Sequence, residues 1–283
     1  MGDQTLPDPV LTPRGRGVVD LGALTRVAVF GGVYNNYLAL DAAIADARGR
    51  GAESLVCLGD LGGFGPRPDR VFPLLRDHEV RVMAGNYDVS VGGGLEDCGC
   101  GYTDPRDNRF AQISYDYTYR NTSAENRAWL AGLPTAFTFR LGDARVLTCH
   151  GSPRQTNEFL WESGTPDGLI RWFLDRTGAD LILATHTGIK WQRRLADGRG
   201  LVNVGALGRP ENDGTTRVWY ALLEASGGDW RAEHVPVSYD HERLAAEMRE
   251  EGLPEEFVET VTTGWWTTCL EILPAKERLS GRF

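Results

Sequence analysis

The chain has 283 residues, with 30 Lys or Arg against 39 Asp or Glu, so its formal net charge is −9. This acidic balance disfavours a protein that binds nucleic acid through phosphates, because such binding needs dense positive charge. A hydrophobic fraction of 41% and a charged fraction of 24% are typical of a globular protein. No apolar run is long enough to span a membrane, and the polar, Pro-rich start predicts no secretory leader. Five Cys residues are too few for a disulfide scaffold, so we expect reduced thiols and a cytoplasmic location.

The pattern of apolar runs predicts strands that alternate with helices along the chain. Strands are expected at 26–30, 54–58, 80–84, 136–140, 145–149, 180–184, 201–204 and 217–223. Helices are expected at 37–48, 69–77, 123–130 and 167–177, with two more between 239 and 263. This alternation predicts an α/β fold built from βαβ units. The Gly-rich stretch 88–109 predicts a long insertion loop.

Three segments are expected on this basis. Residues 1–25, with several Pro and Gly, are predicted to form an N-terminal arm, and residues 26–236 to form one domain. Residues 237–283 are predicted to form a C-terminal helical appendage.

Polar side chains follow four of the predicted strands at the point where each strand ends. Asp60 follows the second strand, Asn86 the third, and His150 and His186 two later ones. Because ligand sites of open parallel sheets form at the carboxyl ends of strands, we expect these side chains to converge. Carboxylate and amide oxygens with imidazole nitrogens are a ligand set for a divalent metal. The alternative is that each is only a hydrogen-bonded loop residue.

Several motifs in fixed order strengthen the metal interpretation. They are 58–61 (LGDL) with 63–66 (GFGP), 85–88 (GNYD), 149–153 (CHGSP), 203–210 (NVGALGRP) and 237–240 (VSYD). Together they resemble the calcineurin-like metallophosphoesterases, in particular the small bacterial members, from about residue 26 to residue 223. The resemblance implies an α/β sandwich of mixed β-sheets flanked by helices. It also implies a metal-dependent phosphoester hydrolase that uses Fe, Mn or Zn.

The departures from the family follow a pattern. The family opens with Asp-x-His, where this chain has Gly32 and Tyr34, and its last motif ends in a His, where this chain has Gly188. These three positions supply one of the family's two metals. The resemblance assigns the other metal to residues that are all present: Asp60, Asn86, His150 and His186. We therefore expect a degenerate first metal site, and either one metal or a second site rebuilt from other ligands.

Two sets of residues are candidates for a rebuilt second site. Tyr34 offers a phenolate, and the alternative is that it packs or contacts substrate. Cys98 and Cys100 offer two thiolates from one side of an extended loop, and the alternative is a pair of exposed, reduced thiols.

The resemblance also implies catalytic roles at the altered Asn-Tyr-Asp box. Tyr87 replaces the family's proton-donating His, and Asp88 is expected to orient it. Because the ordinary pKa of Tyr is about 10, Tyr87 is a poorer acid at neutral pH than His. Tyr34 and Asn35 are expected to contact substrate or a second metal. The cations expected to hold a phosphate are Arg154, Lys190 and Arg209, with exposed surface charges as the alternative.

These observations support three functional hypotheses. The leading one is a metal-dependent phosphoesterase-like hydrolase with an altered metal site that acts on a phosphorylated small molecule. The alternative is a non-catalytic metal-binding or ligand-sensing protein on the same fold, and a third is a metal enzyme with non-phosphate chemistry. A homo-oligomer is compatible with all three.

Overall fold

The computed structural model describes residues 17–279. Most of the predicted N-terminal arm, residues 1–16, therefore lies outside the described residues. The rest of that arm is a strand, β1 (Val18–Leu24), which pairs in parallel with β5 (Ala136–Leu141). The predicted boundary at residue 25 thus falls between two strands.

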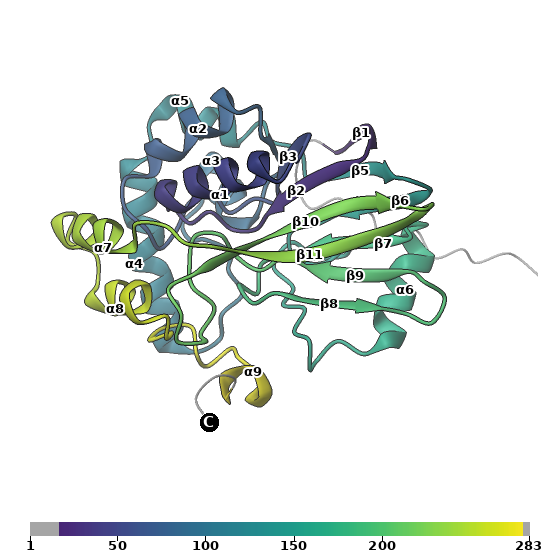
Figure 1. Cartoon of the computed structure of the whole chain (residues 1–283). Coiled ribbons are helices and arrows are strands. Elements are labelled where there is room, and N and C mark those ends of the chain that lie inside the picture. The colour runs from purple at the N-terminus through teal and green to yellow at the C-terminus, as the bar shows by residue number, and fades with distance from the viewer. Residues whose placement is uncertain (1–16, 280–283) are drawn as a thin grey trace, which may run out of the picture.

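Two mixed β-sheets form the centre of the molecule (Figure 1). The six-stranded sheet runs β1, β5, β6 (Ala144–Thr148), β7 (Leu181–Ala184), β9 (Gly200–Asn203) and β8 (Trp191–Arg194). The five-stranded sheet runs β11 (Asp229–Val237), β10 (Val218–Ser226), β2 (Arg26–Phe30), β3 (Ser54–Cys57) and β4 (Arg81–Val82). One buried apolar cluster joins the facing sides of both sheets, with Val29, Val56, Phe139, Leu183 and Val202 among its members.

Helices cover the outer faces of both sheets. The five-stranded sheet packs against α1 (Tyr37–Gly49), α2 (Val71–Asp77), α3 (Asn86–Gly93) and α5 (Ala124–Leu130). A 3-10 turn, η1 (Pro68–Arg70), directly precedes α2. The six-stranded sheet packs against α6 (Asp167–Thr177). This arrangement confirms the predicted fold class.

The predicted loop 88–109 is wrong over much of its length. Helix α3 continues to Gly93, and α4 (Pro105–Asn121) begins at Pro105, so only residues 94–104 connect them. Asp104 starts α4 by accepting hydrogen bonds from the next two free backbone N–H groups, and Pro105 suits the first helical position because it has no N–H. The polar composition of α4 hides its buried stripe of Phe110, Ser114 and Tyr117.

The predicted helical appendage contains α7 (His241–Glu250), α8 (Glu255–Thr263) and α9 (Ala275–Leu279). The first two pack with Phe64, Phe110 and Tyr117 in a separate apolar cluster. Strands β8 and β11 are further elements that the sequence pattern did not predict.

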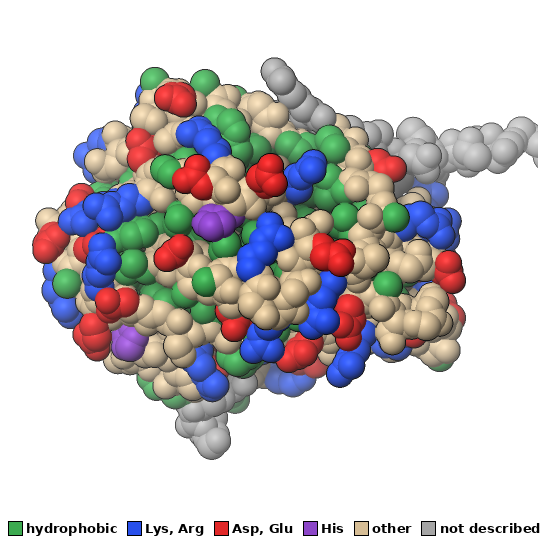
Figure 2. Space-filling model, turned by 45° about the horizontal axis from the view of Figure 1, so that its top comes forward, with side chains coloured by type: hydrophobic (Ala, Val, Ile, Leu, Met, Phe, Trp, Pro, Cys, Tyr) green, Lys and Arg blue, Asp and Glu red, His purple; other side chains and the backbone are tan. Residues whose placement is uncertain are grey.

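The surface is charged but mixed. On the face drawn in Figure 2, basic and acidic side chains alternate without forming an extended patch of one sign. Within residues 17–279, no helix has both the length and the apolar composition for a membrane crossing.

Candidate metal centre

Three predicted ligands converge where the two sheets meet. Asp60 follows β3 of one sheet, whereas His150 and His186 follow β6 and β7 of the other. His150 Nε2 lies 3.1 Å from Asp60 Oδ2 and 3.2 Å from His186 Nδ1. The three side chains are buried, and one ligand atom from each lies within 4.8 Å of the others. Oxygen and nitrogen atoms at this spacing are a candidate metal site.

The backbone holds two of these residues in an uncommon conformation. Asp60 has φ 55° and His186 has φ 69°, in the left-handed region that side chains other than Gly adopt at a cost. The turn at Asp60 is fixed by Asp88, whose carboxylate accepts hydrogen bonds from the N–H groups of Asp60 (2.7 Å), Gly85 (2.8 Å) and Leu61 (3.0 Å). Asp88 therefore shapes the loop that presents Asp60. Its predicted role of orienting Tyr87 stays a prediction, because the hydrogen bonds that its carboxylate accepts come from these backbone N–H groups.

Asn86, the fourth predicted ligand, has one side-chain amide atom without a hydrogen-bond partner among residues 17–279. Its Nδ2 donates to the carbonyl oxygen of Cys98 at 2.9 Å, while its buried Oδ1 has no hydrogen-bond partner among residues 17–279. A buried, unpartnered acceptor is costly unless a ligand satisfies it. His150 shows a second feature of metal-binding His residues, since its Nδ1 donates to the Leu58 carbonyl at 2.7 Å and leaves Nε2 facing the cluster. These residues fit a bound metal ion.

The charges of the cluster also suit a cation. Burial alone would raise the pKa of Asp60, but the adjacent His150 holds it below its ordinary value. Burial and the neighbouring His150 lower the pKa of His186 to about 3, so His186 is neutral. An ionised carboxylate and a neutral imidazole are the protonation states in which these side chains bind metals. Although burial lowers the pKa of His150, the carboxylate of Asp60 raises it above its ordinary value, so His150 would have to lose its proton when a metal ion binds.

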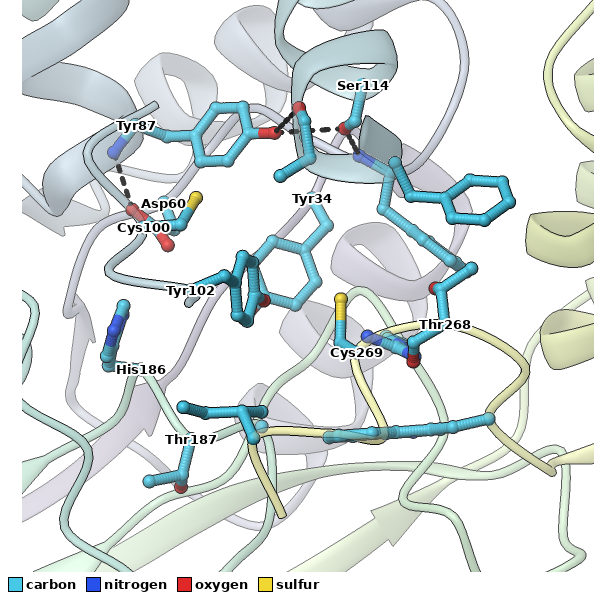
Figure 3. Close-up of a pocket in the computed structure, with 18 of the residues that line it drawn as sticks. Tyr34, Asp60, Tyr87, Cys100, Tyr102, Ser114, His186, Thr187, Thr268 and Cys269 are labelled. Atoms are coloured by element: carbon cyan, nitrogen blue, oxygen red, sulfur yellow. Dashed lines mark hydrogen bonds between the residues drawn. The ribbon is translucent and has the colours of Figure 1, made fainter. Parts of the chain in front are cut away.

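The Tyr34 ring occupies the space in which a side chain at position 32 would begin. A Cβ atom at Gly32 would lie 2.4 Å from Tyr34 Cε1 and 2.9 Å from its hydroxyl oxygen. Burial, followed by the charge of Asp60, raises the pKa of Tyr34, which keeps it a protonated phenol. Figure 3 shows Tyr34 between Asp60 and Cys269 in the same cavity.

Tyr87 also faces this cavity, but its hydroxyl is engaged elsewhere. It donates to Ser114 Oγ on α4 at 3.0 Å, on the far side of the ring from Asp60 (Figure 3). Burial raises the pKa of Tyr87 further above its ordinary value. Both observations weaken the predicted role of Tyr87 as a proton donor.

The predicted thiolate pair is wrong as a second ligand set. Cys98 and Cys100 form a disulfide, so neither sulfur carries the charge of a thiolate, and the expectation of reduced thiols fails here. Cys100 Sγ lies 3.5 Å from Asn86 Nδ2, so this short loop packs directly against a predicted ligand. Cys57, Cys149 and Cys269 are free and buried.

Of the residues predicted to contact substrate, Tyr34 and Arg209 line the cavity, whereas Asn35, Arg154 and Lys190 do not. Arg154 forms an ion pair with Glu158, and Lys190 forms one with Glu211. Asn35 is fully buried, and its Nδ2 holds the loop at Gly65 through the carbonyl oxygen at 3.0 Å.

The cavity and the solvent at its open mouth together take up about 720 Å³. Much of its wall comes from residues that the sequence did not assign: Tyr102, Phe159, Trp161, Trp266, Thr268, Cys269 and Ile272. Four of these belong to the segment between α8 and α9, which we call the C-terminal strap (residues 264–274). The Trp pair at 265–266 is the one sequence feature that marks this segment.

The fold and the ligand cluster agree with a known family. The sequence profile of the calcineurin-like phosphoesterase superfamily domain matches residues 26–228. The chain belongs to this superfamily. The matched region contains all four predicted metal ligands and Arg209 and ends before the C-terminal strap.

Individual relatives cover most of the chain. The uncharacterized protein MJ0912 of Methanocaldococcus jannaschii is 26% identical over 254 residues, which are 84% of this chain and 98% of that protein. The crystal structure of a metallophosphoesterase from Sphaerobacter thermophilus is 26% identical and matches with a TM-score of 0.66, covering 85% of this chain and 99% of that one. The crystal structure of the hypothetical protein PH1004 from Pyrococcus horikoshii OT3 matches with a TM-score of 0.72 at 21% identity, and the match covers 86% of this chain and 99% of that one.

Proposed function

We propose that the protein is a metal-dependent phosphoester hydrolase with a single metal ion held by Asp60, Asn86, His150 and His186. The observation that carries the proposal is the buried cluster of Asp60, His150 and His186 beside the unpartnered Oδ1 of Asn86. A bound divalent or ferric ion, for which Fe, Mn and Zn all suit this ligand set, lowers the pKa of water and polarises a phosphoryl oxygen.

The remaining roles belong to the cavity wall. Arg209 is suited to hold an anionic oxygen of the substrate, because its guanidinium faces the same cavity as Asp60 and His186. Tyr34 fills the space of a side chain at position 32, where the resemblance implies a ligand of the second metal, and this supports a centre with one ion. The proton-donor role of Tyr87 is left out of the proposal, since its hydroxyl bonds to Ser114.

A phosphorylated small molecule is the substrate class that a cavity of this size favours. A cytoplasmic location, the lack of a nucleic-acid partner and the oligomeric state stay predictions from composition. The non-catalytic hypothesis also has support, because the Tyr34 ring fills the space in which a side chain at position 32 would begin.

The test combines metal counting with hydrolysis. The protein is loaded with Mn²⁺, Fe²⁺ or Zn²⁺, passed through a desalting column, and measured for metal per chain and for hydrolysis of aryl phosphate mono- and diesters. We expect one metal per chain and measurable turnover in the wild type. In His150→Ala both are lost, because one of four ligands is removed.

His241→Ala on α7 is the matched control, because His241 lies outside the cavity and contacts the exposed Glu242. It should retain wild-type metal content and turnover. Full metal content in His150→Ala would refute the ligand assignment. Metal binding without hydrolysis of any ester would favour the non-catalytic hypothesis instead.

A further inference from the structure

Arg209 is a buried cation without an acidic partner in the part of the chain that the structure describes. Arg209 is only 7% exposed. None of the ion pairs found among residues 17–279 includes it. Its Nη2 donates to the Thr268 carbonyl at 2.8 Å, while its buried Nε has no hydrogen-bond partner. A buried charge that lacks a counterion is unfavourable unless a ligand supplies one. Arg154 and Lys190 differ in this respect, because each has its own carboxylate.

The C-terminal strap fixes the plane of this guanidinium. Arg209 Cζ lies 3.9 Å from the ring centroid of Trp266 and 5.2 Å from that of Phe64. Trp266 is held in turn by a hydrogen bond from its Nε1 to the Pro210 carbonyl at 2.6 Å. A guanidinium stacked on an aromatic face presents its N–H groups edge-on, and this is the geometry in which Arg recognises phosphoryl oxygens.

A row of aromatic rings leads away from the metal ligands along the same cavity. The Phe159 ring lies 4.3 Å from the His186 ring and stacks on Trp161 at 5.4 Å with an interplanar angle of 3°. Tyr102 packs against Phe159 at 5.9 Å. All of these residues line the cavity, whose charged side chains are Asp60 and Arg209. Planar apolar groups pack well against such a wall.

From these contacts we infer that Arg209, stacked on Trp266 of the C-terminal strap, forms an anion subsite that binds the phosphoryl group of an aromatic phosphoester without help from the metal. The aromatic part of the ligand then lies against Tyr102, Phe159 and Trp161. This inference rests on the proposed function for the identity of the reaction, and it deepens that proposal by naming the substrate class.

The test measures ligand binding in the absence of metal. Full-length protein treated with a chelator is titrated with phenylphosphonate and with methylphosphonate by isothermal calorimetry. We expect phenylphosphonate to bind at least several-fold more tightly than methylphosphonate, because only the former reaches the aromatic wall. Arg209→Gln should weaken phenylphosphonate binding by about 10- to 100-fold, since it removes a charge-assisted interaction.

Two further variants make the result specific. Arg209→Lys keeps the charge but not the planar fork, so its affinity should fall between those of the wild type and Arg209→Gln. Arg154→Gln removes a surface Arg outside the cavity and should bind like the wild type. Thermal unfolding of each variant shows that it is folded before it is titrated.

Each outcome decides the inference. Absence of binding to the metal-free wild type, or equal affinity in Arg209→Gln, would overturn the anion subsite. Equal affinities for the two phosphonates would overturn the aromatic class of ligand. Arg209-dependent binding in a protein that hydrolyses no ester would support the subsite while the proposed hydrolase activity fails, so the two proposals are separately testable.

Discussion

At the scale of single residues, positions 32 and 34 form one arrangement. The Tyr34 ring lies where any side chain at position 32 would begin, so a family-like Asp and this Tyr exclude each other. Gly32 has no left-handed φ that would itself require Gly. The contact with Tyr34 is therefore the reason why a larger residue does not fit.

The pair can be separated by mutation. Gly32→Asp should destabilise the protein by about 1–3 kcal/mol, the usual cost of overpacking a buried site. Gly32→Asp combined with Tyr34→His should recover most of that loss, because the smaller ring leaves the space free, and it should raise metal content above one per chain. Urea unfolding and metal counting provide both readouts. If the single and double variants lose equal stability, the two positions do not compete for this space.

At the scale of elements, α4 connects the core domain to the C-terminal strap. The buried carboxylate of Asp107 accepts hydrogen bonds from the backbone N–H groups of Cys269 at 2.7 Å and Glu271 at 3.2 Å. Arg106, its neighbour on α4, donates to the Thr267 carbonyl at 2.7 Å. These bonds hold the strap across the cavity.

Removal of this carboxylate should release the strap. Asp107→Ala leaves two backbone N–H groups without their acceptor. Each of them that stays buried should lower the free energy of unfolding by about 1–3 kcal/mol. We expect faster chymotrypsin cleavage near Trp265 and Trp266 and weaker phenylphosphonate binding. Asp116→Ala, an exposed position on the same helix, is the control. Wild-type cleavage and binding in Asp107→Ala would mean that the strap is held by other contacts.

The same elements show what the sequence could and could not predict. Asp60, His150 and His186 were predictable because each directly follows a short apolar strand, and the strand ends of this fold converge. The pairing of Arg209 with Trp266 was not, because it joins residues far apart in sequence through a segment with no regular pattern. The Cys98–Cys100 disulfide was missed because the same spacing also suits two thiolate ligands.

At the scale of the whole molecule, the candidate metal centre connects the two sheets. Asp60 belongs to the end of the five-stranded sheet, and His150 and His186 to the end of the six-stranded sheet. An ion held by all three joins the two layers at one edge. Such an ion would bind the folded chain and not the unfolded one. Its binding would therefore shift the folding equilibrium toward the folded state.

Chelation should therefore lower the melting temperature. A ligand at one hundred times its dissociation constant adds about 2.7 kcal/mol of stability, which corresponds to several degrees for a chain of this size. Differential scanning calorimetry with and without metal measures the shift. His150→Ala should melt at the same temperature in both conditions. If the chelator leaves the melting temperature of the wild type unchanged, no metal is held between the sheets.

The order in which the chain is made gives the C-terminal strap a further consequence. The predicted metal ligands, of which His186 comes last, all precede the strap residues Trp266, Thr268 and Cys269 in the sequence, so they leave the ribosome first. During synthesis, the metal ligands are therefore available before the part of the cavity wall that the strap supplies. A nascent chain could therefore take up a metal ion before the strap is made, and the strap would then complete the cavity wall over a site that is already loaded.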